Sequence, residues 1–163
     1  MAIAFIGVGS NLQDPYLQVN TAILNLNNLP ETRLITQSSL YYSSPQGPQD
    51  QPDFVNAVAK IDTSLEPLAL LSALQSQELT QGKLKLRHWG ERLIDLDILL
   101  FDDLEVQSDT LIIPHAQLHL RDFALLPLAE IEPKIHIPNQ QDITSLIEKL
   151  TDKFVKRKSN DIN

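Results

Sequence analysis

The chain contains no cysteine among its 163 residues. Disulfides, thiolate metal sites and cysteine nucleophiles are therefore excluded, and a cytosolic protein is favoured. Long apolar runs are also missing, because none approaches the ~20 residues that a membrane-spanning helix needs. No basic segment precedes the apolar residues at the amino terminus, as one does in a secretory signal. We expect a cytoplasmic protein without a membrane partner.

Positive charge is scarce as well. The 13 lysines and arginines are outnumbered by 21 aspartates and glutamates, which gives a net charge of −8. This balance opposes binding to nucleic acid, because such binding depends on diffuse positive potential. Five of the cations lie either in one short segment or at residue 121: Lys83, Lys85, Arg87, Arg92 and Arg121. In an acidic protein, this concentration indicates an anionic small-molecule ligand.

The apolar periodicity predicts one domain with the element order βαββαβ. The predicted elements cover residues 2–8, 15–26, 33–43, 54–63, 66–79 and 94–101. This order is typical of a ferredoxin-like α+β sandwich, with helices on one face of an antiparallel sheet and the other face free for a ligand.

Further short helices are predicted at residues 121–131 and 142–150. We expect the single domain to span residues 1–152 and the polar tail, residues 153–163, to fray. In the helix over residues 66–79, four leucines are predicted to share one side: Leu68, Leu71, Leu74 and Leu79.

The apolar strand over residues 94–101 contains Asp95 and Asp97, two residues apart. Since side chains alternate along a strand, both carboxylates point to one face, and the apolar residues Ile94, Leu96, Ile98 and Leu100 point to the other. Two converging carboxylates are unfavourable unless a cation neutralises them. Magnesium binds carboxylate and phosphate oxygens, so a metal and phosphate site is predicted. An edge strand with a solvated face remains the alternative.

Four segments together resemble the 6-hydroxymethyl-7,8-dihydropterin pyrophosphokinase (HPPK) family of folate biosynthesis. They are Gly9-Ser10-Asn11, residues 47–56, residues 89–99, and Pro114-His115 followed by Arg121-Asp122-Phe123. The resemblance covers most of the chain. It implies a magnesium-dependent transfer of the β,γ-pyrophosphoryl group of ATP to the hydroxymethyl group of the dihydropterin, giving AMP.

The resemblance also assigns site residues. It implies two magnesium ions at Asp95 and Asp97, with Arg92, Lys83 and Lys85 as further catalytic residues. The residues that it places at ATP are Gln75, Glu78, Trp89, Arg92, His115 and Arg121. The residues that it places at the pterin are Ser43, Ser44, Gln46, Phe54, Asn56 and Phe123. A monomer that acts on these two small molecules is expected.

At several positions the chain departs from the family pattern. Lys83 and Lys85 stand where arginines are common, and they lose the bidentate guanidinium fork. Glu91 replaces a common proline, and Thr110 and Ile112 stand where some members place polar nucleotide contacts. These changes bear on turnover rate and ATP affinity and leave the reaction type unchanged.

Each assigned residue has a structural alternative. The arginines could form surface salt bridges worth about 0–1 kcal/mol. The aromatic residues could be ordinary core, His115 could belong to a capped turn, and Gln75 and Glu78 could lie on a solvated helix face.

Other classes of protein are less well supported. A Rossmann enzyme is suggested by Gly7-Val8-Gly9, but the third glycine of that motif is absent. A regulatory module could share the fold and bind a ligand without turnover, although it has no need of Asp95 and Asp97 beside Arg92. A degenerate relative that keeps the fold without activity is the third alternative. Metal-dependent AMP formation would distinguish an active pyrophosphokinase from all three.

Overall fold

The computed structural model describes residues 1–12, 14–43, 52–81, 94–150 and 155–158. The helices and strands are β1 (Ala2–Ser10), α1 (Pro15–Leu26), β2 (Thr32–Gln37), β3 (Tyr41–Ser43), β4 (Phe54–Thr63), α2 (Pro67–Thr80), β5 (Asp95–Phe101), β6 (Val106–Gln107), β7 (Ile112–Ile113), α3 (Asp122–Ile131), α4 (Ile143–Glu148) and β8 (Val155–Lys158). A short 3-10 turn, Leu118–Leu120, precedes α3. Within the described ranges, no helix is long and apolar enough to cross a membrane.

The main sheet has the order β5-β1-β4-β3-β8, and β2 also pairs with β4. Every one of these strand pairs is antiparallel. The predicted combination of helices with an antiparallel sheet is therefore confirmed. One expectation is corrected at the C-terminus, because residues 155–158 form β8 on the edge of β3 where a frayed tail was predicted.

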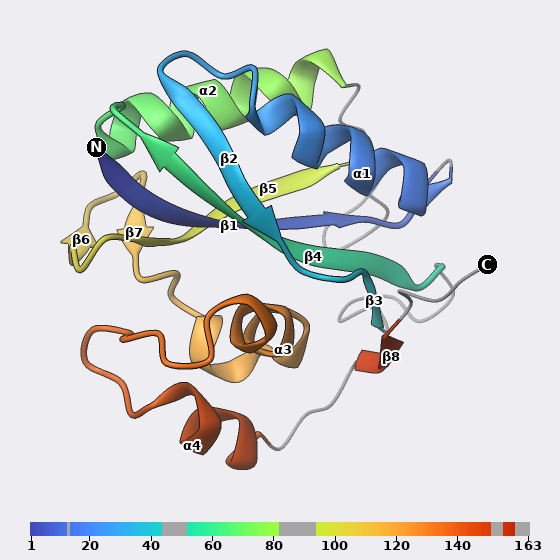
Figure 1. Ribbon diagram of the computed structural model, residues 1–163, viewed down its shortest axis with the longest axis vertical. Helices are drawn as coiled ribbons and strands as arrows, with labels where there is room; N and C mark the ends of the chain where they lie inside the picture. The colour runs from blue at the N-terminus through green and yellow to red at the C-terminus, as the bar shows by residue number, and fades with distance from the viewer. Residues whose placement is uncertain (13, 44–51, 82–93, 151–154, 159–163) are drawn as a thin grey trace.

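Both faces of the sheet carry helices (Figure 1). On one face, α1 and α2 contribute to a core that contains Ile23 and Leu70. On the other face, α3 and α4 pack on Phe5 and Val58 and contribute Leu125 and other buried residues. The expectation that this second face is free was wrong, because its apolar residues need cover and the C-terminal helices provide it.

A β-bulge divides β5 into two parts. Ile6 pairs with Ile98 and Phe5 pairs with Leu100, so Leu99 is an extra residue. Before the bulge the predicted alternation holds, because Leu96 and Ile98 both belong to the core of α1 and α2. After it the alternation reverses, and Leu100 lies in the core of α3 and α4. The prediction that Leu100 shares a side with Leu96 was therefore wrong, since a bulge shifts the register by one residue.

Helix α2 buries only part of the side that was predicted. Leu74 is buried and Leu71 packs against the core, as predicted. Leu68 is 58% exposed and Leu79 is 75% exposed. The buried residues are Leu70, Leu74, Gln77 and Glu78. Leucines surround most of this helix, so apolar spacing alone does not define its buried side, and the position of α2 against β5 decides it.

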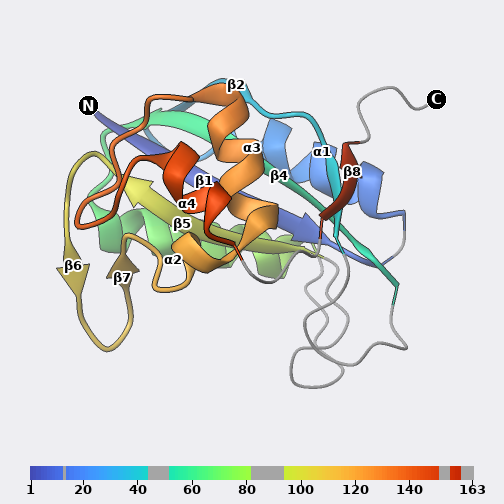
Figure 2. The same ribbon diagram turned by 90° about the horizontal axis from the view of Figure 1, so that it is seen from below.

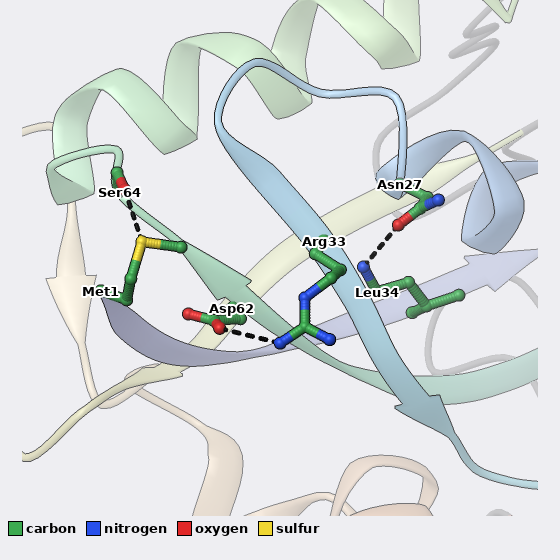
Figure 3. A network of polar contacts seen from close by, with 6 residues as sticks. All are labelled: Met1, Asn27, Arg33, Leu34, Asp62 and Ser64. Atoms are coloured by element: carbon green, nitrogen blue, oxygen red, sulfur yellow. Dashed lines mark hydrogen bonds and ion pairs between the residues drawn. The ribbon is translucent and has the colours of Figure 1, made fainter.

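The edge formed by β2 is held by polar contacts (Figure 3). Arg33 pairs with Asp62 of β4 at 3.2 Å, and the backbone N–H of Leu34 donates to Asn27 Oδ1 at 2.8 Å. Arg33 is exposed and Asp62 is partly buried, so this ion pair contributes about 0–1 kcal/mol. These contacts lie far from β5, which forms the other edge of the sheet. Strand β5 contains Asp95 and Asp97, the predicted metal ligands.

Two leucines of α1 provide a test of the packing. Leu26 is 0% exposed and Leu24 is 65% exposed. Leu26→Ala leaves a cavity and should lower the free energy of unfolding by about 2–5 kcal/mol. Leu24→Ala should change it by about 0.5 kcal/mol or less. Urea denaturation measures both, and equal losses would contradict the described orientation of α1.

Candidate functional site

Three strands bring the predicted site residues to one face of the sheet. In the strand register, Gly9 of β1 is paired with Asp95 of β5 on one side and with Asn56 of β4 on the other. Directly paired residues of antiparallel strands point to the same side of a sheet. Asp95, Asp97 and Asn56 therefore face α3, as does Val58 in the core below that helix. The predicted convergence of the two aspartates is consistent with this register.

Gly9 provides space for Asn56. A Cβ atom at Gly9 would lie 2.8 Å from Asn56 Oδ1, which is closer than such atoms can approach. The Asn56 side chain is buried, and its Nδ2 donates to Ser43 Oγ of β3. Asn11, two residues after Gly9, is also buried, and its Nδ2 donates to the Pro52 carbonyl at 3.0 Å. The Gly9-Ser10-Asn11 motif thus lies between the Asp95 side and the Asn56 side of the candidate site.

Arg121 lies at the start of α3, near both aspartates. Its guanidinium carbon is 5.5 Å from the ring centroid of Phe123, and its Nη2 donates to Gln117 Oε1 at 3.0 Å. Burial lowers the pKa of Arg121, whereas the charges of Asp97 and Asp95 raise it. Its buried Nε has no hydrogen-bond partner among the described residues. The Arg121 guanidinium is thus a cation beside the two carboxylates that can pair with an anion there.

His115 is held as a neutral ring. Burial, and next the charge of Arg121, lower its pKa to about 4, although Asp95 opposes the shift. Its Nδ1 accepts from the Gln117 backbone N–H at 3.2 Å, so Nε2 carries the proton of the neutral ring. The His115 backbone N–H donates to the Leu99 carbonyl at 3.0 Å, which ties this loop to the bulge of β5.

A pocket of about 280 Å³ lies beside Asp97 and His115. Its wall includes Leu71 from α2, Ile98 from β5, and Thr110 and Ile112 from the β6–β7 hairpin. This hairpin extends from the sheet as a separate arm (Figure 2). The sequence pointed to Thr110 and Ile112 but not to the hairpin, because strands of two residues are too short to show a period. Leu71 was predicted only as a packed residue of α2.

The remaining predicted residues differ in how they are placed. Ser43, Phe54 and Asn56 lie together on β3 and β4. Gln75 is exposed on α2. Glu78 is buried and does not lie on a solvated helix face, and its Oε2 accepts from the Leu96 backbone N–H at 2.7 Å. Its contact with ATP stays a prediction. Six predicted site residues lie outside the described residues: Ser44, Gln46, Lys83, Lys85, Trp89 and Arg92.

The donor set fits a hard divalent cation. Asp95 and Asp97 are partly buried and supply two carboxylates. Within the described ranges, no group of three or more His, Asp or Glu side chains could hold a metal by itself. Magnesium suits such a site, because it takes one or two protein carboxylates and completes its shell with water and substrate phosphates.

A family model described as "7,8-dihydro-6-hydroxymethylpterin-pyrophosphokinase (HPPK)" matches residues 5–133. A Haemophilus influenzae protein named 2-amino-4-hydroxy-6-hydroxymethyldihydropteridine pyrophosphokinase is 49% identical over 152 residues, which cover 93% of this chain and 95% of the relative. A Pseudomonas aeruginosa protein of the same name is 45% identical over 143 residues, 88% of each chain.

The fold is also found in solved structures. A Plasmodium falciparum HPPK-DHPS crystallised with pteroate superimposes with a TM-score of 0.72 at 16% identity. The match covers 91% of this chain and 42% of that longer protein. At this identity the comparison concerns the fold alone.

The Gly9 contact predicts the effect of adding one methyl group. Gly9→Ala should displace the Asn56 side chain and lower the free energy of unfolding by about 1–3 kcal/mol. Gly7→Ala is the matched control, because its Cβ would lie 3.3 Å from the flexible end of Leu99. NMR of the Asn56 side-chain amide and urea denaturation measure the two effects. An unshifted amide in Gly9→Ala would contradict the close approach.

The lowered pKa of His115 predicts how stability depends on pH. The ordinary pKa is 6.5 and the folded value is about 4, so the unfolded chain binds more protons between these pH values. Stability conferred by the neutral ring is complete above pH ~6.5 and is lost as the pH falls toward 4. His115→Gln should therefore lose less stability than the parent protein when the pH is lowered from 7.5 to 4.5. Thermal unfolding at both pH values measures this, and identical losses would contradict the assignment.

Proposed function

Because the chain belongs to the 7,8-dihydro-6-hydroxymethylpterin-pyrophosphokinase family, it is a diphosphotransferase, and we propose how its residues carry out the transfer. One observation supports the assignment most strongly. Asp95 and Asn56 are both paired with Gly9 and lie two strands apart on one face of the sheet. The proposed metal ligand Asp95 is therefore close to Asn56, whose amide is proposed to bind the pterin. Adjacent strands are about 4.8 Å apart, so this spacing suits a transfer between two bound substrates.

The reaction moves the β,γ-pyrophosphoryl group of ATP to the hydroxymethyl oxygen of 6-hydroxymethyl-7,8-dihydropterin and releases AMP. Such a transfer needs an attacking oxygen held in line and neutralisation of the charge that shifts during the step. Asp95 and Asp97 are proposed to hold two magnesium ions, which supply charge neutralisation at the phosphates when bound. The protein residues then orient the substrates around them.

We place the nucleotide in the pocket beside Asp97. Neutral His115 carries its proton on Nε2 and can donate to a phosphate oxygen. The Arg121 guanidinium provides further donors near both aspartates. In addition, Gln75 is proposed as a contact from α2. Four residues outside the described ranges are proposed to complete the phosphate side: Lys83, Lys85, Trp89 and Arg92.

The pterin is proposed to lie over the ends of β3 and β4. Asn56 and Ser43 form a buried hydrogen-bonded pair that can read the polar edge of the ring. Phe54 shares the face of Asn56, because both are on β4 two residues apart. Phe123 at the start of α3 provides the second aromatic wall. Ser44 and Gln46 are proposed to complete this part of the site.

The architecture supports the same assignment at the level of the fold. We propose a ferredoxin-like sandwich, because the strands that follow the βαββαβ order are arranged as β5-β1-β4-β2. The single domain is proposed to span residues 1–152, to which β8 adds an edge strand beside β3. A monomer is proposed. A cytoplasmic location is also proposed, and the lack of cysteine in the sequence is compatible with it.

Phosphorus NMR tests the proposal directly. With magnesium, ATP and the dihydropterin alcohol, AMP and a pterin diphosphate should appear together. Asp95→Asn and Asp97→Asn should each lower the rate by about 10²–10³-fold, because each removes charge where the phosphates are held.

Asp103→Asn is the matched control, since this exposed aspartate lies just beyond β5 and outside the pocket beside Asp97. Its rate should match that of the parent protein. Formation of ADP would contradict pyrophosphoryl transfer, and ligand binding without turnover would favour a degenerate relative.

A further inference from the structure

Glu78 of α2 is a buried carboxylate that contacts β5, the strand of Asp95 and Asp97. Its side chain is 5% exposed, and its Oε2 accepts a 2.7 Å hydrogen bond from the backbone N–H of Leu96. Leu96 is the residue between Asp95 and Asp97. We propose that Glu78 is a positioning residue that fixes the direction of both aspartates. This inference rests on the proposed metal role of the aspartates.

The contact fills a gap at the edge of the sheet. Strand β5 ends the sheet order and pairs with β1 alone among the described strands. In the part of the chain that the structure describes, the amides on its outer edge have no strand partner, and an edge strand can shift more easily than a central one. Glu78, from α2, replaces the missing partner at Leu96. The carboxylate therefore restrains β5 where the sheet itself does not.

The restrained peptide bond is the one that joins Asp95 to Leu96. Holding its N–H fixes the plane of this peptide, because the peptide unit is rigid. The backbone torsions on either side then set the direction in which the Asp95 side chain leaves the strand. On the other side of the peptide, the Leu96 side chain is buried in the core of α1 and α2, which opposes rotation of the strand about its own axis. Both neighbours of Leu96 are oriented as a result.

The position of Glu78 supports an action through the backbone. Helix α2 covers the face of the sheet that contains Leu96 and Ile98, whereas Asp95 and Asp97 point to the face of α3. A hydrogen bond from an amide to a carboxylate is about twice as strong as one between neutral groups. Loss of the carboxylate also leaves a buried N–H without this acceptor.

The adjacent residue provides a matched control. Gln77 is 9% exposed on the same turn of α2, and its Nε2 donates to the Ala22 carbonyl of α1 at 2.9 Å. Gln77→Ala therefore removes a buried hydrogen bond of α2 that does not reach β5. If α2 packing alone matters, Gln77→Ala and Glu78→Ala should behave alike.

The test measures Mn²⁺ binding by electron paramagnetic resonance, with a non-hydrolysable ATP analogue and the full chain. Glu78→Ala should weaken Mn²⁺ binding about 10–100-fold, as is typical when a group that orients a metal ligand is removed. Glu78→Gln keeps an acceptor oxygen and should restore most of the affinity. Glu78→Asp keeps the charge but is one methylene shorter, so it should resemble Glu78→Ala. Gln77→Ala should bind Mn²⁺ like the parent protein.

Hydrogen exchange checks the contact itself, because the Leu96 amide should lose protection in Glu78→Ala and keep it in Gln77→Ala. Unchanged Mn²⁺ affinity in both Glu78→Ala and Glu78→Asp would overturn the proposal, as would equal weakening in Gln77→Ala. If Glu78→Ala does not fold, the comparison of Glu78→Asp with Glu78→Gln decides. If Asp95→Asn and Asp97→Asn also leave Mn²⁺ binding unchanged, the proposed metal site itself fails.

Discussion

The pairing of β1 with its two neighbours is the interaction on which the rest of the structure depends. Strand β1 is hydrogen-bonded to β4 along its whole length and to β5 along most of it. This register aligns the end of β1 with the start of β4 and the start of β5. The chemistry then lies at one end of the sheet, because three chain segments that are far apart in sequence meet there. Gly9 lies between the other two strands, and because it has no side chain it leaves room for Asn56.

The two faces of the sheet differ in the side chains that cover them. The face of α1 and α2 is filled by aliphatic side chains and holds the strands in place. The other face is apolar toward the end of the sheet near Phe5, where α3 and α4 cover it, and polar toward the end near Gly9. Helix α3 belongs to both regions, since its later turns are core and its first turn follows Arg121. The packing of one helix thus positions a cation against the carboxylates of another element.

Much of this arrangement could be predicted from the sequence because it depends on local patterns. Strand alternation predicted that Asp95 and Asp97 share a face, and proline at the start of α1 and α2 marked where those helices begin. Features that depend on tertiary packing could not be predicted. The buried side of α2, the cover of the second face and the bulge at Leu99 all follow from how elements meet. The partner of Glu78 is a backbone amide, which has no signature in the sequence.

The extra residue in the bulge of β5 connects two parts of the site. Removal of Leu99 would leave a regular ladder in which Ile98 is still opposite Ile6 and Leu100 is still opposite Phe5, so both halves of the strand would keep their faces. The bulge is therefore not needed for the direction of Asp95 and Asp97. It supplies instead a carbonyl that accepts from the His115 backbone N–H and a side chain buried in the core of α3 and α4. A one-residue deletion here would thus uncouple the loop of His115 from the strand of the two aspartates while the aspartates keep their orientation.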